Sequence, residues 1–401
     1  MPFETGTPQK HARSLSELDM KFNLRLFVKQ ISYSLTRTEN TPARLTPRRI
    51  AILLFFFPVF TILKLSSWLG FAWDDLFYKE YQQQKLAQPV FIIGNPRSGT
   101  TFLHRLMARD ERNFSYIRMW EVIFAPSVSQ RKLLWFFKKI DDALGGKLQS
   151  WVLKQEQKTY VANPIHKMGL REPEEDEGIL FNIWETIFTT VVFPHPDLVR
   201  KYAFFDKQVP LLERRKIMRF YRSCLRRHLF ARHSDKKFLS KNPTFSPKVD
   251  SLYEFFPDAK IIYLVRNPLD TVPSIISWMS YQWKQFSDPA ESYVFKDYML
   301  ALAKEWYEYP LERFARAPED SYAIIRYEDL AQNPKRIISD IYEKFGFEIS
   351  PEFEKILDEA TQTSRSFKSK HRYSLRKMGL SKREILKTFA AVFKRFGFDT
   401  R

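Results

Sequence analysis

The stretch from residue 89 to residue 103 constrains the fold more than any other part of the sequence. Residues 90–93 form a short apolar run rich in β-branched side chains, which is typical of a strand covered on both faces. Gly94 and Gly99 bracket the loop that follows, and the apolar periodicity after residue 100 predicts a helix. A strand, a glycine loop and a helix start in this order predict an anion-binding site, because the first N–H groups of a helix are unpaired.

This loop departs from the ATPase phosphate-loop pattern at one informative position. Against G-x-x-x-x-G-K-[ST], Gly94 and Gly99 have the correct spacing and Thr101 occupies the hydroxyl position, but Thr100 replaces the lysine. The cation lies inside the loop instead, at Arg97. Because the ATPase lysine serves the β- and γ-phosphates, its loss predicts a nucleotide with a shorter phosphate chain.

A second candidate anion site lies about 165 residues downstream. Residues 261–265 form another apolar strand, and Arg266 follows it directly. Asn267 is a good helix N-cap and Pro268 suits the first helical position, so Ser274 falls about two turns into a helix. Arg266 and Ser274 can therefore bracket a second anion. The strand is not followed by the aspartate that holds magnesium in ATPases, so we expect no metal.

Three motifs carry a family resemblance. The loop G-N-P-R-S-G-T-T at 94–101, the segment 266–274 and the later R-Y-E-D-L at 326–330 resemble sulfotransferases that use 3′-phosphoadenosine 5′-phosphosulfate (PAPS). The resemblance extends from about residue 88 to residue 398. It implies that the 5′-phosphosulfate of PAPS is held by Arg97, Ser98, Gly99, Thr100 and Thr101. It also implies that the 3′-phosphate is held by Arg266 and Ser274, with further contacts from a late basic loop at Lys370, Arg372 and Arg376.

The residues of sulfuryl transfer are predicted less directly. The reaction needs cations and usually a base, and Arg97 and Lys241 are the candidate cations, Lys241 matching the family's strand-end lysine. The family's histidine two residues beyond this lysine is replaced by Pro243. The segment 171–177 is similar to an acidic motif of a bacterial branch of the family, although acids at a helix start also stabilise the helix dipole. The candidate bases are Glu174, Glu175 and Glu177, with Glu175 favoured, followed by His166 and then His104.

The remaining strand candidates complete the fold prediction. Residues 237–240 and 322–326 are short apolar runs separated from the first two strands by long helical patterns. We therefore predict an α/β fold with a phosphate-loop-like parallel sheet flanked by helices, in a catalytic domain at 88–401. Ligands bind at the carboxyl ends of such strands, where we expect Arg97, Lys241, Arg266 and Glu328.

The chain before this domain is basic and then apolar. Residues 1–49 are predicted to be a basic, partly flexible region, and residues 50–87 a hydrophobic, membrane-associated helical segment. The unbroken apolar run, residues 50–63, is shorter than the roughly 20 residues of a membrane span, although continuation to Trp73 would suffice. We favour a helix at the membrane interface over a single-pass span or a buried core helix. A span would place the N-terminus in the cytoplasm, with Arg48 and Arg49 before it and acids after it.

Composition narrows the partners and the compartment. The net charge of +19 comes from dispersed basic residues, so nucleic acid is not expected as the main partner. Cys224 is the only cysteine, which fits a reducing compartment and hence the cytoplasmic face of a membrane. The acceptor is expected to carry a hydroxyl or amine on a small molecule, lipid or carbohydrate. Alternatives are an ATP-dependent kinase-like enzyme and a catalytically inactive, nucleotide-binding membrane protein.

Overall fold

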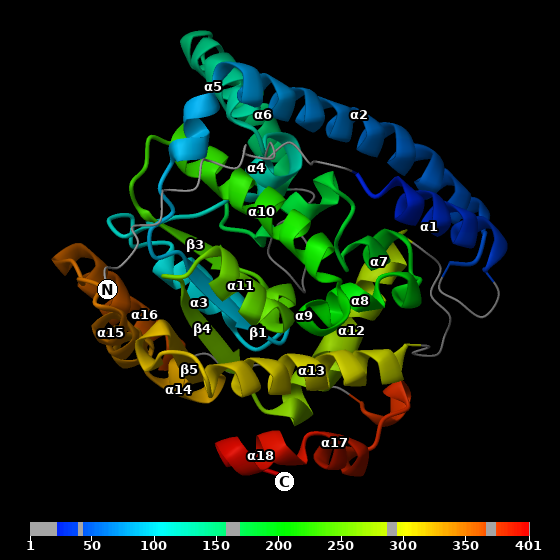
Figure 1. Ribbon diagram of the computed structural model, residues 1–401, viewed down its shortest axis with the longest axis vertical. Helices are drawn as coiled ribbons and strands as arrows, with labels where there is room; N and C mark the ends of the chain where they lie inside the picture. Colours follow the sequence, from blue (N-terminus) through cyan, green and yellow to red (C-terminus); the bar gives the residue numbers. More distant parts are fainter. Residues whose placement is uncertain (1–21, 39–42, 158–168, 287–294, 366–373, 401) are drawn as a thin grey trace, which may run out of the picture.

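A five-stranded parallel sheet forms the centre of the protein (Figure 1). The computed structural model describes residues 22–38, 43–157, 169–286, 295–365 and 374–400. The strands are β1 (Val90–Gly94), β2 (Phe114–Ser115), β3 (Lys237–Lys241), β4 (Lys260–Val265) and β5 (Tyr322–Arg326), in the order β2-β3-β1-β4-β5. The predicted α/β fold is confirmed, including all four predicted strands. The edge strand β2 was not predicted, because two residues show no periodicity.

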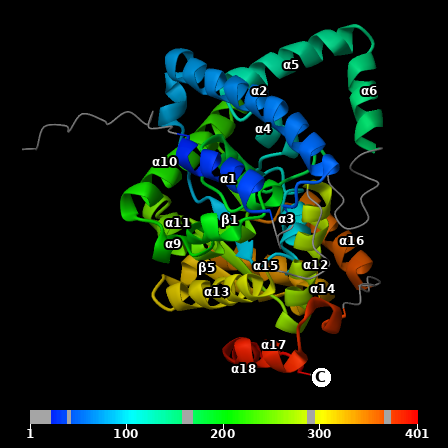
Figure 2. The same cartoon turned by 90° about the vertical axis from the view of Figure 1, so that its right-hand side faces the viewer.

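Helices cover both faces of this sheet, and further helices lie outside these layers (Figures 1 and 2). They are α1 (Leu24–Thr36), α2 (Pro47–Phe77), α3 (Thr100–Met107), α4 (Met119–Phe124), α5 (Val128–Ala143), α6 (Lys147–Glu156), α7 (Thr189–Val192), α8 (Arg200–Ala203), α9 (Phe205–Gln208), α10 (Leu211–Ala231), α11 (Val249–Phe255), α12 (Pro268–Phe286), α13 (Lys296–Phe314), α14 (Tyr327–Gln332), α15 (Pro334–Phe345), α16 (Pro351–Arg365), α17 (Lys382–Thr388) and α18 (Ala390–Phe396). Short 3₁₀ helices are η1 (Lys79–Gln83), η3 (Asp176–Asn182), η4 (Pro196–Leu198), η5 (Pro243–Lys248), η6 (Glu319–Ser321) and η7 (Arg376–Met378).

The alternation of side chains along the strands divides the core in two. In β1, Val90 and Ile92 pack with α3, α14, α15 and α16, whereas Phe91 and Ile93 pack in the larger core with α10, α11, α12 and α13. All of these strand residues are fully buried, as expected for a parallel sheet covered on both faces. The sheet is therefore fixed in position, and the loops at the carboxyl ends of its strands have a rigid base.

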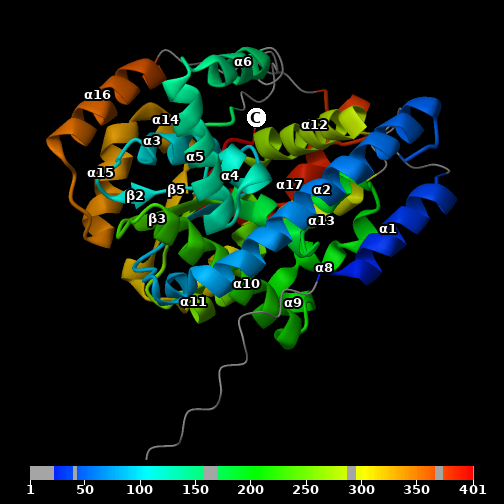
Figure 3. The same cartoon turned by 90° about the horizontal axis from the view of Figure 1, so that it is seen from above.

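Helix α2 lies along the outside of the protein with its two ends attached to the same body. It is 31 residues long, and only 11% of its most apolar 18-residue window is buried. It is therefore not a core helix. Seen from above, α2 crosses the molecule diagonally, with α1 beside one end (Figure 3), and the start of α5 is hydrogen-bonded to it. Its length and composition would also suit a membrane span.

Candidate active site

The phosphate-type loop has the backbone geometry that its glycines predict. After β1, Gly94 has φ +143° and Gly99 has φ +95°. A Cβ atom on Gly99 would lie 2.4 Å from the Tyr327 ring, so glycine is required for space as well as for conformation. Helix α3 begins at Thr100, and Ser98 Oγ donates to Asn95 O at 2.7 Å, which tightens the turn. The N-terminal N–H groups of α3 therefore face the loop.

The two predicted anion sites lie next to each other in space. Arg97 Nε donates to Ser274 Oγ at 3.1 Å, and Arg266 Nη1 donates to the carbonyl of Arg97 at 3.2 Å. The Arg266 guanidinium lies 4.5 Å from the centroid of the Tyr327 ring, which packs against Gly99. The two sites are adjacent because β1 and β4 pair in parallel, so the loops that follow these strands leave the sheet at the same edge.

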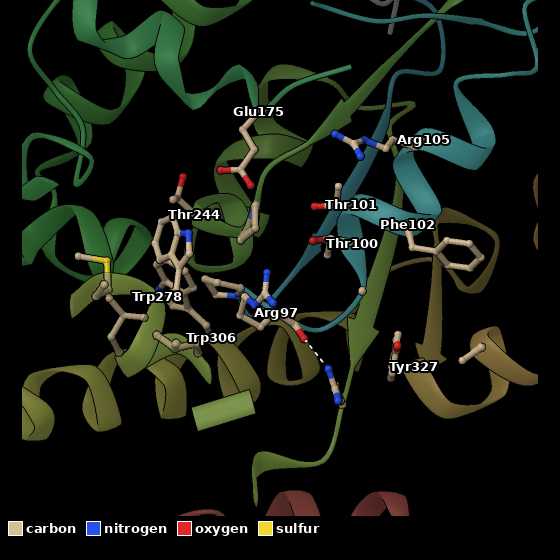
Figure 4. A pocket seen from close by; sticks show the side chains of 18 of the residues that line it. Arg97, Thr100, Thr101, Phe102, Arg105, Glu175, Thr244, Trp278, Trp306 and Tyr327 are labelled. Atoms are coloured by element: carbon tan, nitrogen blue, oxygen red, sulfur yellow. Dashed lines mark hydrogen bonds between the residues drawn. The ribbon is translucent and has the colours of Figure 1, made fainter. Parts of the chain in front are cut away.

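A cavity of about 1040 Å³ opens at this edge and has two chemically distinct halves (Figure 4). One half is lined by loop and helix-start residues, among them Arg97, Gly99, Thr100, Thr101 and Arg266. The other half is aromatic and aliphatic, and it includes Trp278, Met279 and Trp283 of α12, Trp306 of α13 and Phe188. In Figure 4, Glu175 lies between Thr100 and Thr101 on one side and the indole of Trp278 on the other, and Thr244 lies next to this indole. The polar half suits phosphates and the apolar half suits an uncharged molecule.

Lys241 and Glu175 form an ion pair, and its carboxylate lies at the boundary between these halves (Figure 4). Lys241 is the last residue of β3, and its Nζ lies 2.6 Å from Glu175 Oε1 and 3.9 Å from Glu174 Oε1. The Lys241 side chain is 1% exposed, whereas Glu175 lines the cavity. Burial raises the pKa of the Glu175 carboxyl, and the Lys241 ammonium partly offsets this rise. A carboxylate with a raised pKa beside a buried cation is suited to accept a proton.

A buried polar network lies directly behind this pair. Asn242 Nδ2 donates to Asp176 Oδ1 at 3.1 Å and to Glu177 Oε2 at 3.2 Å. Glu177 also accepts from Thr186 at 2.6 Å and from Lys248 at 3.2 Å. Since Asn242 follows Lys241, and Asp176 follows Glu175, the network joins the backbone on both sides of the ion pair. Glu177 is fully buried and all its partners are internal, so its position suits structure rather than contact with a ligand.

The other predicted base positions differ in their surroundings. His104 is buried on α3 and does not line the cavity, and burial, followed by the Lys241 charge, holds its pKa well below the usual value. Glu174 is close to Lys241 but does not line the cavity. His166 lies outside the described residues.

Only part of the predicted late basic loop lies within the residues that the structure describes. Lys370 and Arg372 lie outside the described residues. Arg376 is exposed in η7 and does not line the cavity. Its role in holding a 3′-phosphate stays a prediction.

The sequence did not predict the apolar half of the cavity. It also did not predict that Tyr327 contributes to the polar half. Tyr327 belongs to the motif at 326–330, so its aromatic ring could have been noticed there. The tryptophans of α12 and α13 carry no such signal, because aromatic residues at helical spacing are typical of any core.

The polar half of the cavity has the features of a site for a ligand that carries two separate phosphate groups. Arg266 lines the cavity, and its buried Nε atom has no hydrogen-bond partner within the ranges that the structure describes. A buried guanidinium N–H without an acceptor is costly unless a ligand supplies one. In the described part of the chain, no group of three or more His, Cys, Asp or Glu residues could hold a metal ion.

The known proteins to which this chain is similar are sulfotransferases. Residues 89–351 match the model of the sulfotransferase family. Omega-hydroxy-beta-dihydromenaquinone-9 sulfotransferase Stf3 of Mycobacterium bovis is 26% identical over 302 residues, which cover 73% of this chain and 71% of that protein. The Mycobacterium tuberculosis protein of the same name gives the same values.

Two crystal structures share the fold. Sulfotransferase STF1 of Mycobacterium tuberculosis has a TM-score of 0.69 at 20% identity, covering 93% of this chain and 94% of that one. Sulfotransferase STF9 of Mycobacterium avium has a TM-score of 0.69 at 15% identity, covering 95% and 98%. Neither the kinase-like alternative nor the inactive-protein alternative is favoured by these similarities.

Proposed function

Because the chain belongs to the sulfotransferase family, with PAPS as its sulfuryl donor, we propose that Glu175 and Lys241 carry out the transfer to an apolar alcohol. The observation that carries this proposal is the Lys241–Glu175 ion pair, whose carboxylate lies at the boundary of the two cavity halves. A donor held in the polar half and an acceptor in the apolar half would meet at this pair. Lys241 and Glu175 are then the groups beside the reacting atoms.

The residues of the polar half have assigned roles in this proposal. The α3 N-terminus with Arg97 and Thr101 would hold the 5′-phosphosulfate, and Arg266 with Ser274 would hold the 3′-phosphate. PAPS supplies a sulfuryl group whose bond to the 5′-phosphate breaks as the acceptor oxygen bonds to sulfur, leaving adenosine 3′,5′-bisphosphate.

The boundary pair handles the proton and the developing charge. Glu175 accepts the proton of the acceptor hydroxyl, and the Lys241 ammonium stabilises negative charge on the bridging oxygen. Because Glu175 must be ionised to act, and burial raises its pKa, we expect kcat/KM to fall as the pH falls through that raised pKa.

The class of acceptor is proposed from the apolar lining. Trp278, Trp283 and Trp306 contribute large apolar surfaces to the lining, together with aliphatic residues such as Ile275 and Leu302. The relative named for a hydroxylated menaquinone acts on a lipid. We therefore infer a lipid alcohol as the acceptor, with its chain in the aromatic half.

Helix α2 is proposed to lie on the membrane surface. At its N-terminal end, Arg49 donates to the carbonyls of Val192, at 2.7 Å, and Phe286. Near its C-terminal end, Asp74 accepts from Arg227 at 3.1 Å. A span would separate these ends by the thickness of the bilayer, about 30 Å, whereas both contact one domain. An interfacial position keeps these contacts and covers the exposed apolar face.

A substitution series tests the catalytic assignment. We expect Glu175→Gln to lower kcat about 10²- to 10⁴-fold with PAPS and a long-chain alcohol, because the base is lost while the side-chain volume is kept. Glu174→Gln is the matched control and should change kcat less than about tenfold. Calorimetric titration with adenosine 3′,5′-bisphosphate, without metal, should give equal affinities for both variants and the wild type. Unchanged turnover in Glu175→Gln would refute the assignment.

A further inference from the structure

Helices α5 and α6 form a hairpin with an apolar outer face. Six large apolar side chains of this hairpin are each more than half exposed, namely Leu133, Phe136, Phe137, Leu144, Leu148 and Trp151. On α5 they recur at intervals of three or four residues, so they share one side of the helix. Soluble proteins rarely expose so many large apolar groups together without a partner for them.

The part of the chain that the structure describes covers α6 only weakly. None of its ten residues is buried. Isolated helices of this length are marginal in water, because a helix draws most of its stability from packing. Within the described residues, α6 packs mainly against α5, and even Val152 and Leu153 are only half-buried. A partner surface on its exposed side would supply further packing.

The turn between the two helices is nevertheless well formed. Asp141 Oδ1 and Oδ2 accept from the N–H groups of Leu148 and Gln149, both at 2.9 Å, and so cap the start of α6. Gly146 N donates to Asp141 O at 2.7 Å, and both glycines of the turn have positive φ. The hairpin is thus held in one shape, with the apolar tip residue Leu144 next to the turn.

The hairpin is fixed to α2. Asp74 of α2 accepts from the N–H groups of Val128 and Ser129, at 2.7 and 2.8 Å, and so caps α5. The two helices cross closely at Gly70, where a Cβ atom would lie 2.4 Å from Ser127 Oγ. The views in Figures 1, 2 and 3 agree that α2, α5 and the start of α6 occupy the same side of the molecule.

Charge on the hairpin selects the kind of partner. Residues 128–156 contain six Lys or Arg residues and three Asp or Glu residues. Of the cations, Arg131 is buried beside Glu121 and Lys138 pairs with Asp142, so the remaining surface charge is positive. Lys138 and Lys139 are exposed beside the apolar side chains of α5, and Lys147 and Lys154 lie on α6. Apolar side chains flanked by lysines are the combination that binds an anionic membrane surface.

We propose that the α5–α6 hairpin is a second membrane-contact element, which seats the protein on an anionic bilayer together with α2. This inference rests on the proposed interfacial position of α2, and it does not depend on the catalytic assignment. It also connects the membrane with the active site. Glu156, the last residue of α6, accepts from the N–H of Leu170, five residues before Glu175. Glu175 therefore lies five residues from a segment that is hydrogen-bonded to the end of the hairpin.

Vesicle flotation of the full-length protein tests the proposal. The probes are vesicles of phosphatidylcholine alone and of phosphatidylcholine with phosphatidylglycerol. The test variant is Phe136→Glu/Phe137→Glu, and the matched control is Leu211→Glu/Leu212→Glu, which changes two exposed apolar residues at the start of α10. We expect the test variant to lose at least about tenfold in partition onto anionic vesicles, and the control less than about twofold. Wild-type protein should prefer the anionic vesicles.

Three further readouts separate the alternative outcomes. Adenosine 3′,5′-bisphosphate affinity should be unchanged in the test variant, which shows that the protein is folded. Leu54→Glu/Phe55→Glu on α2 should also lower partition, and if only this variant does so, the hairpin is not a membrane contact. Light scattering after gel filtration reports the oligomeric state. A wild-type dimer that becomes monomeric in the test variant, with partition unchanged, would assign the hairpin to a second copy of the chain and overturn the proposal.

Discussion

Replacing Asp176 by asparagine should change how stability depends on pH. Asp176 is buried behind Glu175, where it accepts from Tyr221 and from Asn242. Burial raises the pKa of its carboxyl from 3.8 to about 6. Between these two values the folded protein binds more protons than the unfolded chain, so the free energy of unfolding falls as the pH rises. The rise in pKa corresponds to about 3 kcal/mol, which is present at low pH and lost as the pH passes 6.

Asparagine at position 176 keeps the shape and the hydrogen bond from Tyr221 but removes the titration. The free energy of unfolding of Asp176→Asn minus that of the wild type should therefore increase by about 2 to 3 kcal/mol between pH 4 and pH 7. Urea unfolding followed by tryptophan fluorescence at several pH values measures this difference. Asp235→Asn, at an exposed position, corrects for the loss of one negative charge. A difference that is constant with pH, or that decreases, would refute the reasoning.

Two further substitutions probe the polar half of the cavity. Gly99→Ala should lower the affinity for adenosine 3′,5′-bisphosphate at least about tenfold and lower the melting temperature, because the new Cβ meets the Tyr327 ring at a positive φ. Gly145→Ala, at a similar φ but with nothing within 4 Å, isolates the effect of that contact; equal losses in both variants would contradict it. Arg266→Ala should weaken adenosine 3′,5′-bisphosphate by about 1.5 to 3 kcal/mol in calorimetry while leaving adenosine 5′-monophosphate nearly unchanged. Equal losses for both nucleotides would argue against a 3′-phosphate contact.

The parts of the fold that the sequence predicted are those with strong local signals. The apolar runs at residues 90–93 of β1 and 261–265 of β4 are followed directly by a glycine and an arginine, so the type of these strands and their carboxyl ends could be recognised. The parallel pairing of β1 and β4 places the loops after these strands side by side. The proximity of Arg97 and Arg266 could therefore be predicted from the two strands alone. The two residues of β2 have no such signal, and they pair only because β3 offers an open edge.

The roles within the acidic segment depended on packing that a sequence does not reveal. Glu174, Glu175 and Glu177 have the same chemistry and lie within four positions. In the structure, Asp176 and Glu177 are fully buried against Asn242, and Glu175 faces the cavity. Which residue faces the cavity depends on the 3₁₀ helix that begins at Asp176, since its period differs from those of α-helices and strands. Tertiary contacts with η5 and β3 therefore distinguish chemically equal carboxylates.

Helix α2 shows why hydropathy and flanking charge alone do not determine the geometry of the membrane contact proposed for it. In the sequence, the basic residues Arg48 and Arg49 before the apolar run and the acidic residues Asp74 and Asp75 after it predicted the orientation of a membrane span. In the structure Arg49 and Asp74 are buried, Arg49 on the carbonyl of Val192 and Asp74 on the start of α5. Charges that are engaged in folding cannot also act as free flanking charges at a bilayer surface, and withdrawing them would leave buried partners unpaired. The same two contacts that weaken the argument for a span fix the apolar face of α2 outward, beside the hairpin, and so support attachment along the membrane surface.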